Sequence, residues 1–166
     1  MRSVLLFPYV APVVALAYTW ELLLDPNSGT LNSLLVNFQI IEQPINLLGQ
    51  RYINLEFFGI EFKLRLALTT VIIFEIWRYF PLAFLFILAR LQAVPKELYE
   101  AAEVDGAGPF QKFVNITLPQ ITAVISILFM IRFIWNFNKF EDIFLLTGGA
   151  SGTRTLPINV YEQGFA

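Results

Sequence analysis

Three long apolar segments, separated by polar stretches, set the strongest limit on what this chain can fold into. They cover about 4–24, 64–91 and 119–137, and a helix of roughly 20 apolar residues is long enough to cross a bilayer. Only 14% of the 166 residues are charged, whereas about a quarter are charged in soluble domains. The sequence therefore predicts an all-α, polytopic membrane protein that is surrounded by lipid.

The polar stretches complete the predicted organisation of a single membrane domain over 1–166. We expect an external loop over 25–63, a cytoplasmic loop over 93–118, a loop over 138–157 and the start of a last helix over 158–166. The external loop has room for short amphipathic helices around 31–38 and 54–62. A signal peptide is the alternative for the first segment, because Arg2 precedes the apolar run and Ala15-Leu16-Ala17 resembles a cleavage site. Pro8 and Pro12 argue against that alternative.

The residue types that are missing or scarce exclude several kinds of chemistry. The chain has no Cys and no His, so it lacks thiols and the commonest metal ligand and general base. No nucleophile–base pair or metal cluster is recognisable, which argues against a membrane-embedded enzyme. A net charge of −2 gives no basic surface for nucleic acid.

The polar stretch over 99–121 carries the most specific pattern. Glu100-Ala101-Ala102 is followed by Asp105-Gly106-Ala107, then by Phe113 and finally by Ile116-Thr117-Leu118-Pro119. This order resembles the EAA signature of the permease (transmembrane) subunits of binding-protein-dependent ABC importers, and within that family the sugar-importing branch. Glu-Ala-Ala alone would suit a solvated connector equally well. Further positions fit the same family: Trp77, Pro81, Thr147-Gly148-Gly149, Thr155, Leu156, Tyr161 and Phe165.

The resemblance implies part of a type I ABC importer permease fold in the cell membrane of a prokaryote. It also implies the partners: two ATPase subunits, a second homologous permease subunit and an external substrate-binding protein. ATP and Mg would be bound by the ATPase, and we expect no cofactor in this chain because it lacks a phosphate-cradling glycine-rich loop with Lys. The resemblance begins at the family's third helix and stops as the sixth begins, so we interpret the chain as a fragment, a truncated gene or one piece of a split subunit. Ala150 and Ser151 stand where the family often has Pro.

The resemblance assigns the loop with the EAA pattern to contact with the ATPase. The residues expected to couple the two subunits are Glu100, Ala101, Ala102, Glu103, Asp105, Gly106 and Ala107. Small alanine side chains permit close backbone approach, carboxylates can bind partner cations, and Gly106 permits a turn with positive φ. The sequence predicts a short helix starting at Pro95, a glycine turn, and a second helix starting at Pro109.

Ionisable residues inside membrane segments are candidates for the transport path, because burying them is costly. Glu75 and Arg78 lie three residues apart on one helix face and can pair, either as a purely structural ion pair or along the path. Arg132 could pair with Glu75 across helices.

The stretch after the third segment offers candidate sugar contacts. Trp135, Asn136 and Asn138 combine an aromatic face with amides, and the family resemblance implies that such residues line the central site. The alternative is that these amides only satisfy helix ends or neighbouring helices.

The sequence thus favours a permease subunit for a sugar or related polyol. A cargo such as phosphate, polyamine or an amino acid, and a membrane anchoring fragment without transport, remain alternatives. Lys and Arg divide evenly between the two expected faces, so the positive-inside rule does not fix the orientation and the EAA pattern alone sets it.

Overall fold

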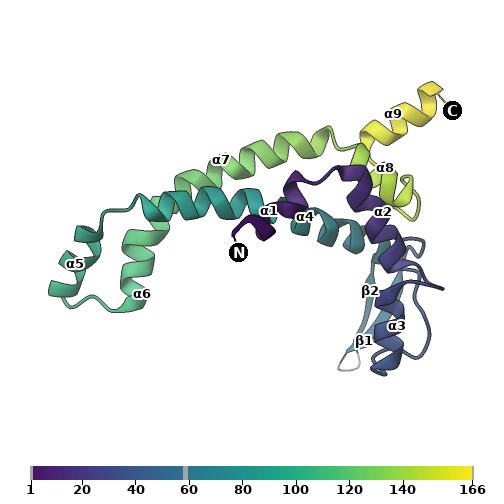
Figure 1. Ribbon diagram of the computed structural model, residues 1–166, viewed down its shortest axis with the longest axis horizontal. Helices are drawn as coiled ribbons and strands as arrows, with labels where there is room; N and C mark the ends of the chain where they lie inside the picture. The colour runs from purple at the N-terminus through teal and green to yellow at the C-terminus, as the bar shows by residue number, and fades with distance from the viewer. Residues whose placement is uncertain (1, 58–59, 166) are drawn as a thin grey trace. The chain divides into compact units, whose positions relative to one another are not determined.

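The computed structural model describes residues 2–57 and 60–165 (Figure 1). The sequence predicted a single membrane domain, and the structure divides the chain into two compact units. The first unit is Met1–Tyr9 with Tyr79–Asn136, and the second is Val10–Arg78 with Phe137–Ala166. In chain order the elements are α1 (Arg2–Val10), α2 (Val13–Leu24), α3 (Thr30–Asn37), β1 (Ile53–Phe57), β2 (Ile60–Leu64), α4 (Leu66–Gln92), α5 (Lys96–Val104), α6 (Pro109–Lys112), the π-helical turn η1 (Phe113–Thr117), α7 (Leu118–Phe137), α8 (Glu141–Thr147) and α9 (Leu156–Phe165).

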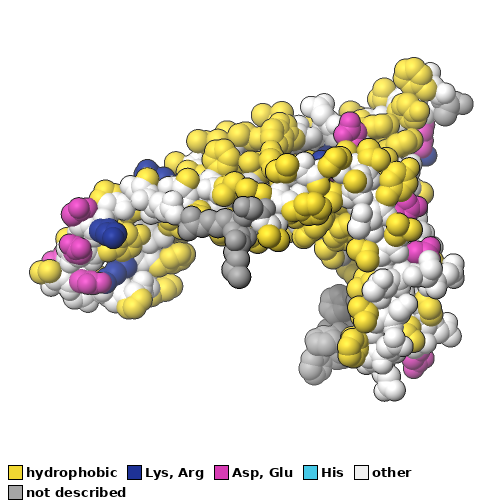
Figure 2. Space-filling model, viewed as in Figure 1, with side chains coloured by type: hydrophobic (Ala, Val, Ile, Leu, Met, Phe, Trp, Pro, Cys, Tyr) yellow, Lys and Arg dark blue, Asp and Glu magenta, His cyan; other side chains and the backbone are white. Residues whose placement is uncertain are grey.

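The predicted helical class is confirmed, and two stretches of helix are long and apolar enough to cross a membrane. They are Leu66–Gln92, which is α4, and Pro109–Phe137, which runs from α6 through η1 into α7. In α7 only Leu128 is buried. Figure 2 shows hydrophobic side chains along the exposed face of this helix. An apolar helix that is exposed nearly all round is expected where the surrounding solvent is lipid.

The prediction of one continuous helix over 4–24 is wrong. The structure places α1 and α2 there, bent by 105° at the break between them. Pro12 has no backbone N–H to donate, and its ring disfavours the helical conformation of the preceding Ala11. Pro12 itself adopts φ −57° and ψ 131°, outside the helical region.

The external loop is only partly helical as predicted. The helix predicted around 31–38 is present as α3. The prediction of a helix around 54–62 is wrong, because β1 and β2 form an antiparallel hairpin in which Asn54 faces Lys63. Apolar and polar residues alternate along Ile53–Phe57, and that period of two favours a strand. Residues 58–59 lie outside the described part of the chain.

The predicted loop over 138–157 contains a helix, α8, and α9 begins at Leu156, ahead of the predicted 158. Glu141 and Asp142 occupy the first turn of α8, where carboxylates interact favourably with the positive end of the helix dipole. That start signal lies within the stretch that was predicted to be a loop.

The core of the second unit brings α2, α4, α8 and α9 together. Its buried residues are Leu16, Ala17, Val71, Phe74, Ile143, Leu146 and Ile158. Trp20 packs edge-on against Phe74 with ring centroids 5.2 Å apart. Because Phe74 is fully buried, this contact fixes the N-terminal half of α4 against α2.

Candidate functional site

The EAA loop, defined here as residues 93–118, folds into the predicted helix, glycine turn and second helix. Its first helix, α5, starts one residue later than predicted, because Pro95 occupies the N-cap position and Lys96 the first helical one. α6 begins at Pro109 as predicted. The amide N–H of Gly108 donates to Oε1 of Gln111 over 2.8 Å, which caps the start of α6.

Gly106 ends α5 in a left-handed turn with φ +75°. The N–H of Ala107 donates to the carbonyl of Ala102 over 2.8 Å, and the N–H of Gly106 donates to the carbonyl of Glu103 over 3.0 Å. This pair of hydrogen bonds is the Schellman pattern, in which a glycine satisfies the last carbonyls of a helix. The Ala-Ala and Asp-Gly-Ala parts of the motif therefore share one helix end.

Three polar contacts hold the EAA loop and the helix ends beside it together within the first unit. Nζ of Lys112 lies 2.5 Å from Oε1 of Glu103, and the hydroxyls of Tyr99 and Thr117 lie 2.9 Å apart. Nε of Arg90 donates to the carbonyl of Gln120 over 3.0 Å, and its Nη2 donates to the side-chain oxygen of Gln120. These contacts link the end of α4, the helix α5 and the start of α7.

The outer face of the loop presents acidic and apolar side chains together. Glu100, Glu103 and Asp105 are exposed, and Val104 and Phe110 are 89% and 77% exposed. Figure 2 shows this mixture of charged and hydrophobic groups at its left end, over α5 and α6. Apolar side chains that no part of the loop covers, set among carboxylates, suit contact with another protein.

The second unit contains a largely buried network that includes four ionisable side chains. Nη1 of Arg78 pairs with Oδ1 of Asp142, and Nζ of Lys139 bridges Oδ2 of Asp142 and Oε2 of Glu75, the latter over 2.7 Å. Asp142 is 3% exposed and Lys139 is 11% exposed. Each of these four side chains lies beside a group of opposite charge, which lowers the cost of burying it.

The structure pairs Glu75 with Lys139 and Arg78 with Asp142, and the pairing of Glu75 with Arg78 that their spacing suggested stays a prediction. Sequence reasoning missed Asp142 because it lies in a stretch that was expected to be a loop. The signal that could have found it is the acidic first turn of α8 beside the Lys139 cation.

The remaining candidate path residues lie in the C-terminal half of α7 or directly after it. Asn136 and Asn138 are exposed, and Trp135 is 44% exposed. Arg132 lies over the ring of Tyr79 in the first unit, with its Cζ 3.6 Å from the ring centroid. This cation–π contact gives a guanidinium on a membrane helix a favourable neighbour.

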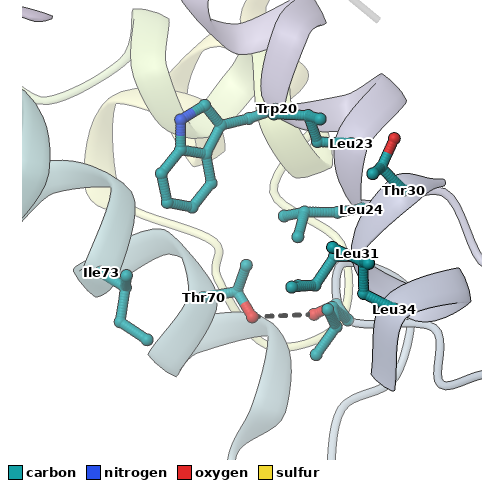
Figure 3. A pocket seen from close by; sticks show the side chains of 9 residues that line it. Trp20, Leu23, Leu24, Thr30, Leu31, Leu34, Thr70 and Ile73 are labelled. Carbon is teal, nitrogen blue, oxygen red and sulfur yellow. Dashed lines mark hydrogen bonds between the residues drawn. The ribbon is translucent and has the colours of Figure 1, made fainter. Parts of the chain in front are cut away.

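An apolar cavity of about 390 Å³ lies in the second unit between α2, α3 and α4 (Figure 3). Trp20, Leu31 and Ile73 line it together with other aliphatic side chains. The hydroxyl of Thr70 is already engaged, since it donates to the carbonyl of Leu47 over 3.2 Å. With so few polar groups pointing into it, this cavity does not suit a sugar.

Comparison with known proteins identifies the class. The model of the binding-protein-dependent transport system inner membrane component family matches residues 1–164. The chain is 36% identical to the inner membrane ABC transporter permease protein YcjO of Escherichia coli, over 99% of this chain and 51% of that protein. It is 33% identical to the trehalose/maltose transport system permease protein MalF of Thermococcus litoralis, and 35% identical to the sn-glycerol-3-phosphate transport system permease protein UgpA of Yersinia pseudotuberculosis, in each case over 99% of this chain and 52% of the relative.

The chain therefore belongs to this family of inner-membrane transport components, as the EAA pattern predicted. It spans about half the length of the curated relatives it matches. Its fold is similar to that of a crystallised bacterial ABC transporter involved in the import of alginate, with a TM-score of 0.69 and 23% identity, over 99% of this chain and 53% of that one.

Proposed function

We propose that this chain is the membrane-spanning part of an ABC importer subunit in a prokaryotic cell membrane, and that the importer moves a sugar or related polyol. The observation that carries the proposal is the EAA loop, whose motif forms one exposed helix end tied to α4 and α7. ATP hydrolysis would take place in a separate ATPase subunit, and this chain would convert movement of the loop into movement of its membrane helices. Two ATPase subunits and a second, homologous permease subunit would complete the complex.

The geometry of the EAA loop supports its assignment as the ATPase contact. Carboxylates at Glu100, Glu103 and Asp105 can receive partner cations, and Val104 and Phe110 can enter an apolar groove. The hydroxyl of Tyr99 joins α5 to Thr117, directly before α7, and Arg90 of α4 donates to Gln120 of α7. A push on α5 would thus be passed to the ends of α4 and α7.

The names of relatives support the cargo class. Among the similar proteins are permeases named for trehalose and maltose and for sn-glycerol-3-phosphate, all of them small polyhydroxylated solutes. Asn136, Asn138 and Trp135 remain the proposed sugar contacts, with Glu75 and Arg78 as further path residues. A phosphorylated polyol is the second candidate cargo, because one relative is named for such a compound.

Co-purification with the ATPase subunit tests the role of the loop. In the complete importer, Glu100→Lys and Gly106→Val should each reduce the amount of ATPase recovered with the permease. Glu141→Lys, which reverses an exposed carboxylate in the second unit, is the matched control and should leave recovery unchanged. Full recovery and full uptake in both loop variants would exclude this loop as the ATPase contact.

Uptake measurements test the path. Asn136→Ala and Asn138→Ala should lower the uptake of labelled sugar while leaving assembly with the ATPase unchanged. If both variants take up sugar at the wild-type rate over the whole concentration range, these amides do not contact the cargo.

A further inference from the structure

Three exposed cations of the second unit gather around one tyrosine and one glycine. Cζ of Arg51 and Nζ of Lys63 lie 5.2 Å and 4.9 Å from the ring centroid of Tyr52. A Cβ added to Gly152 would lie 3.0 Å from Nε of Arg51 and 3.4 Å from Nη2 of Arg65. We name Arg51, Lys63 and Arg65 the basic cluster.

Backbone and side-chain hydrogen bonds hold the segments of this cluster together. The N–H of Leu66 donates to the carbonyl of Arg51 over 3.2 Å, and the N–H of Ala67 donates to the carbonyl of Gln50 over 3.1 Å. The hydroxyl of Ser151 donates to the carbonyl of Gly49 over 2.6 Å. The segment 49–51 is thus bound to the first turn of α4, and Ser151 is bound to that segment, so hydrogen bonds fix the backbone that carries these cations.

The positive charge of the cluster is not neutralised within the described part of the second unit. None of the carboxylates whose side chains the structure describes forms an ion pair with Arg51, Lys63 or Arg65. Arg154 is different, since its Nη2 lies 2.6 Å from Oε2 of Glu162. Like charges held close together create a positive potential that attracts an anionic surface and speeds its association.

The position of the cluster along α4 indicates which side of the membrane it faces. The cluster precedes Leu66, where α4 begins, and the EAA loop follows Gln92, where α4 ends. A helix that crosses the bilayer has its two ends on opposite sides, and α4 is long and apolar enough to do so. If the ATPase binds the EAA loop, the basic cluster faces the outside.

We propose that the basic cluster is the docking surface for an acidic face of the importer's external substrate-binding protein. This inference rests on the proposed function. Arg and Tyr are enriched at the centres of protein–protein interfaces, and here two Arg and one Tyr lie on a backbone that hydrogen bonds fix. Carboxylates of the partner would pair with the guanidinium groups, which offer several donors in a rigid plane.

The test is the association rate of the purified binding protein with the complete importer in nanodiscs of phosphatidylcholine. Arg51→Gln/Arg65→Gln should slow association by about tenfold or more at low ionic strength, and the difference should shrink as salt is added. Arg154→Gln, which removes a cation that Glu162 already neutralises, should change the rate much less. Recovery of the ATPase with each variant checks that the complex is intact. Lys63→Gln provides a second variant if the double variant does not assemble.

Three results would overturn the inference. The first is an unchanged association rate in an intact double variant. The second is a defect that appears only when the nanodiscs contain phosphatidylglycerol, which would assign the cluster to lipid headgroups. The third is a wild-type complex that recovers its ATPase but does not bind the binding protein. If the wild-type complex fails to recover its ATPase, the proposed function itself is rejected. Failure of the docking surface and failure of the proposed function are therefore distinguishable.

Discussion

The chain contains two sets of ion pairs with similar partners, one in the EAA loop and one in the second unit, and they differ in their exposure to water. In the EAA loop, Lys112 and Glu103 meet at the surface, where the side chain of Glu103 is 67% exposed. In the second unit, Asp142 meets Arg78 and Lys139 where it is only 3% exposed. Water screens the first pair far more than the second, so removing one partner should destabilise the fold strongly only in the second. The comparison shows that an ion pair's importance depends on its burial more than on its distance.

The largest expected effect is the loss of the shared carboxylate in the buried network. Asp142→Ala removes the group that both Arg78 and Lys139 bind, and breaking a buried ion pair typically costs about 3–5 kcal/mol. We expect a markedly lower unfolding temperature in detergent, and Glu141→Ala at the exposed neighbouring position as control should change it little. A wild-type unfolding temperature for Asp142→Ala would show that the network does not stabilise the second unit.

Two glycines allow the same backbone change to be made in the two regions. Gly106 and Gly148 have φ of +75° and +59°, and an added Cβ would have no neighbour within 4 Å at either. Alanine at each should therefore cost about 1–2 kcal/mol, from left-handed backbone strain alone. Gly148→Ala should lower global stability because α8 carries core residues, whereas Gly106→Ala should only speed amide exchange in α5. Equal global losses would contradict the separation of the two regions.

A smaller effect is expected from the hydroxyl contact inside the EAA loop. Tyr99→Phe deletes one hydrogen bond to Thr117, and such a bond contributes about 0.5–1.5 kcal/mol. The variant should keep the ATPase bound but transport less cargo per ATP hydrolysed, because α5 is less firmly joined to α7. Tyr18→Phe, which changes an exposed tyrosine of α2, is the control. A wild-type ratio of transport to hydrolysis would exclude Tyr99 from force transfer.

The smallest effect is expected at the exposed pair, and it should depend on pH. The hydrogen bond from Lys112 lowers the pKa of the Glu103 carboxyl below its ordinary value. A lowered pKa contributes stability that is present above the unfolded-state pKa and is lost as the pH falls through the folded-state pKa. Glu103→Gln should therefore remove a slight acid-side dependence of amide exchange in α5, and high salt should do the same. An acid-side dependence of equal size in the variant would assign it to another group.

Some parts of the structure could be predicted from the sequence and others could not, for physical reasons. The EAA loop was predictable because Gly106 and Pro109 impose local backbone geometry whatever surrounds them. The break at Pro12 was missed because lipid-facing composition continues across it, and apolarity alone does not reveal a bend. The hairpin of β1 and β2 was missed because strands of five residues are too short for their alternation to be told from a short amphipathic helix.

The sequence by itself determined the membrane class, the family and the helix–turn–helix of the EAA loop, because hydrophobic length and glycine and proline conformations act locally. Only the tertiary structure decided that Lys139 and Asp142 pair with Glu75 and Arg78. It alone also decided that Arg51, Lys63 and Arg65 meet at Tyr52 and Gly152. Those groupings join residues far apart in the chain, and which charges share a buried site depends on how the helices pack. Residue spacing along one helix carries no information about partners on another.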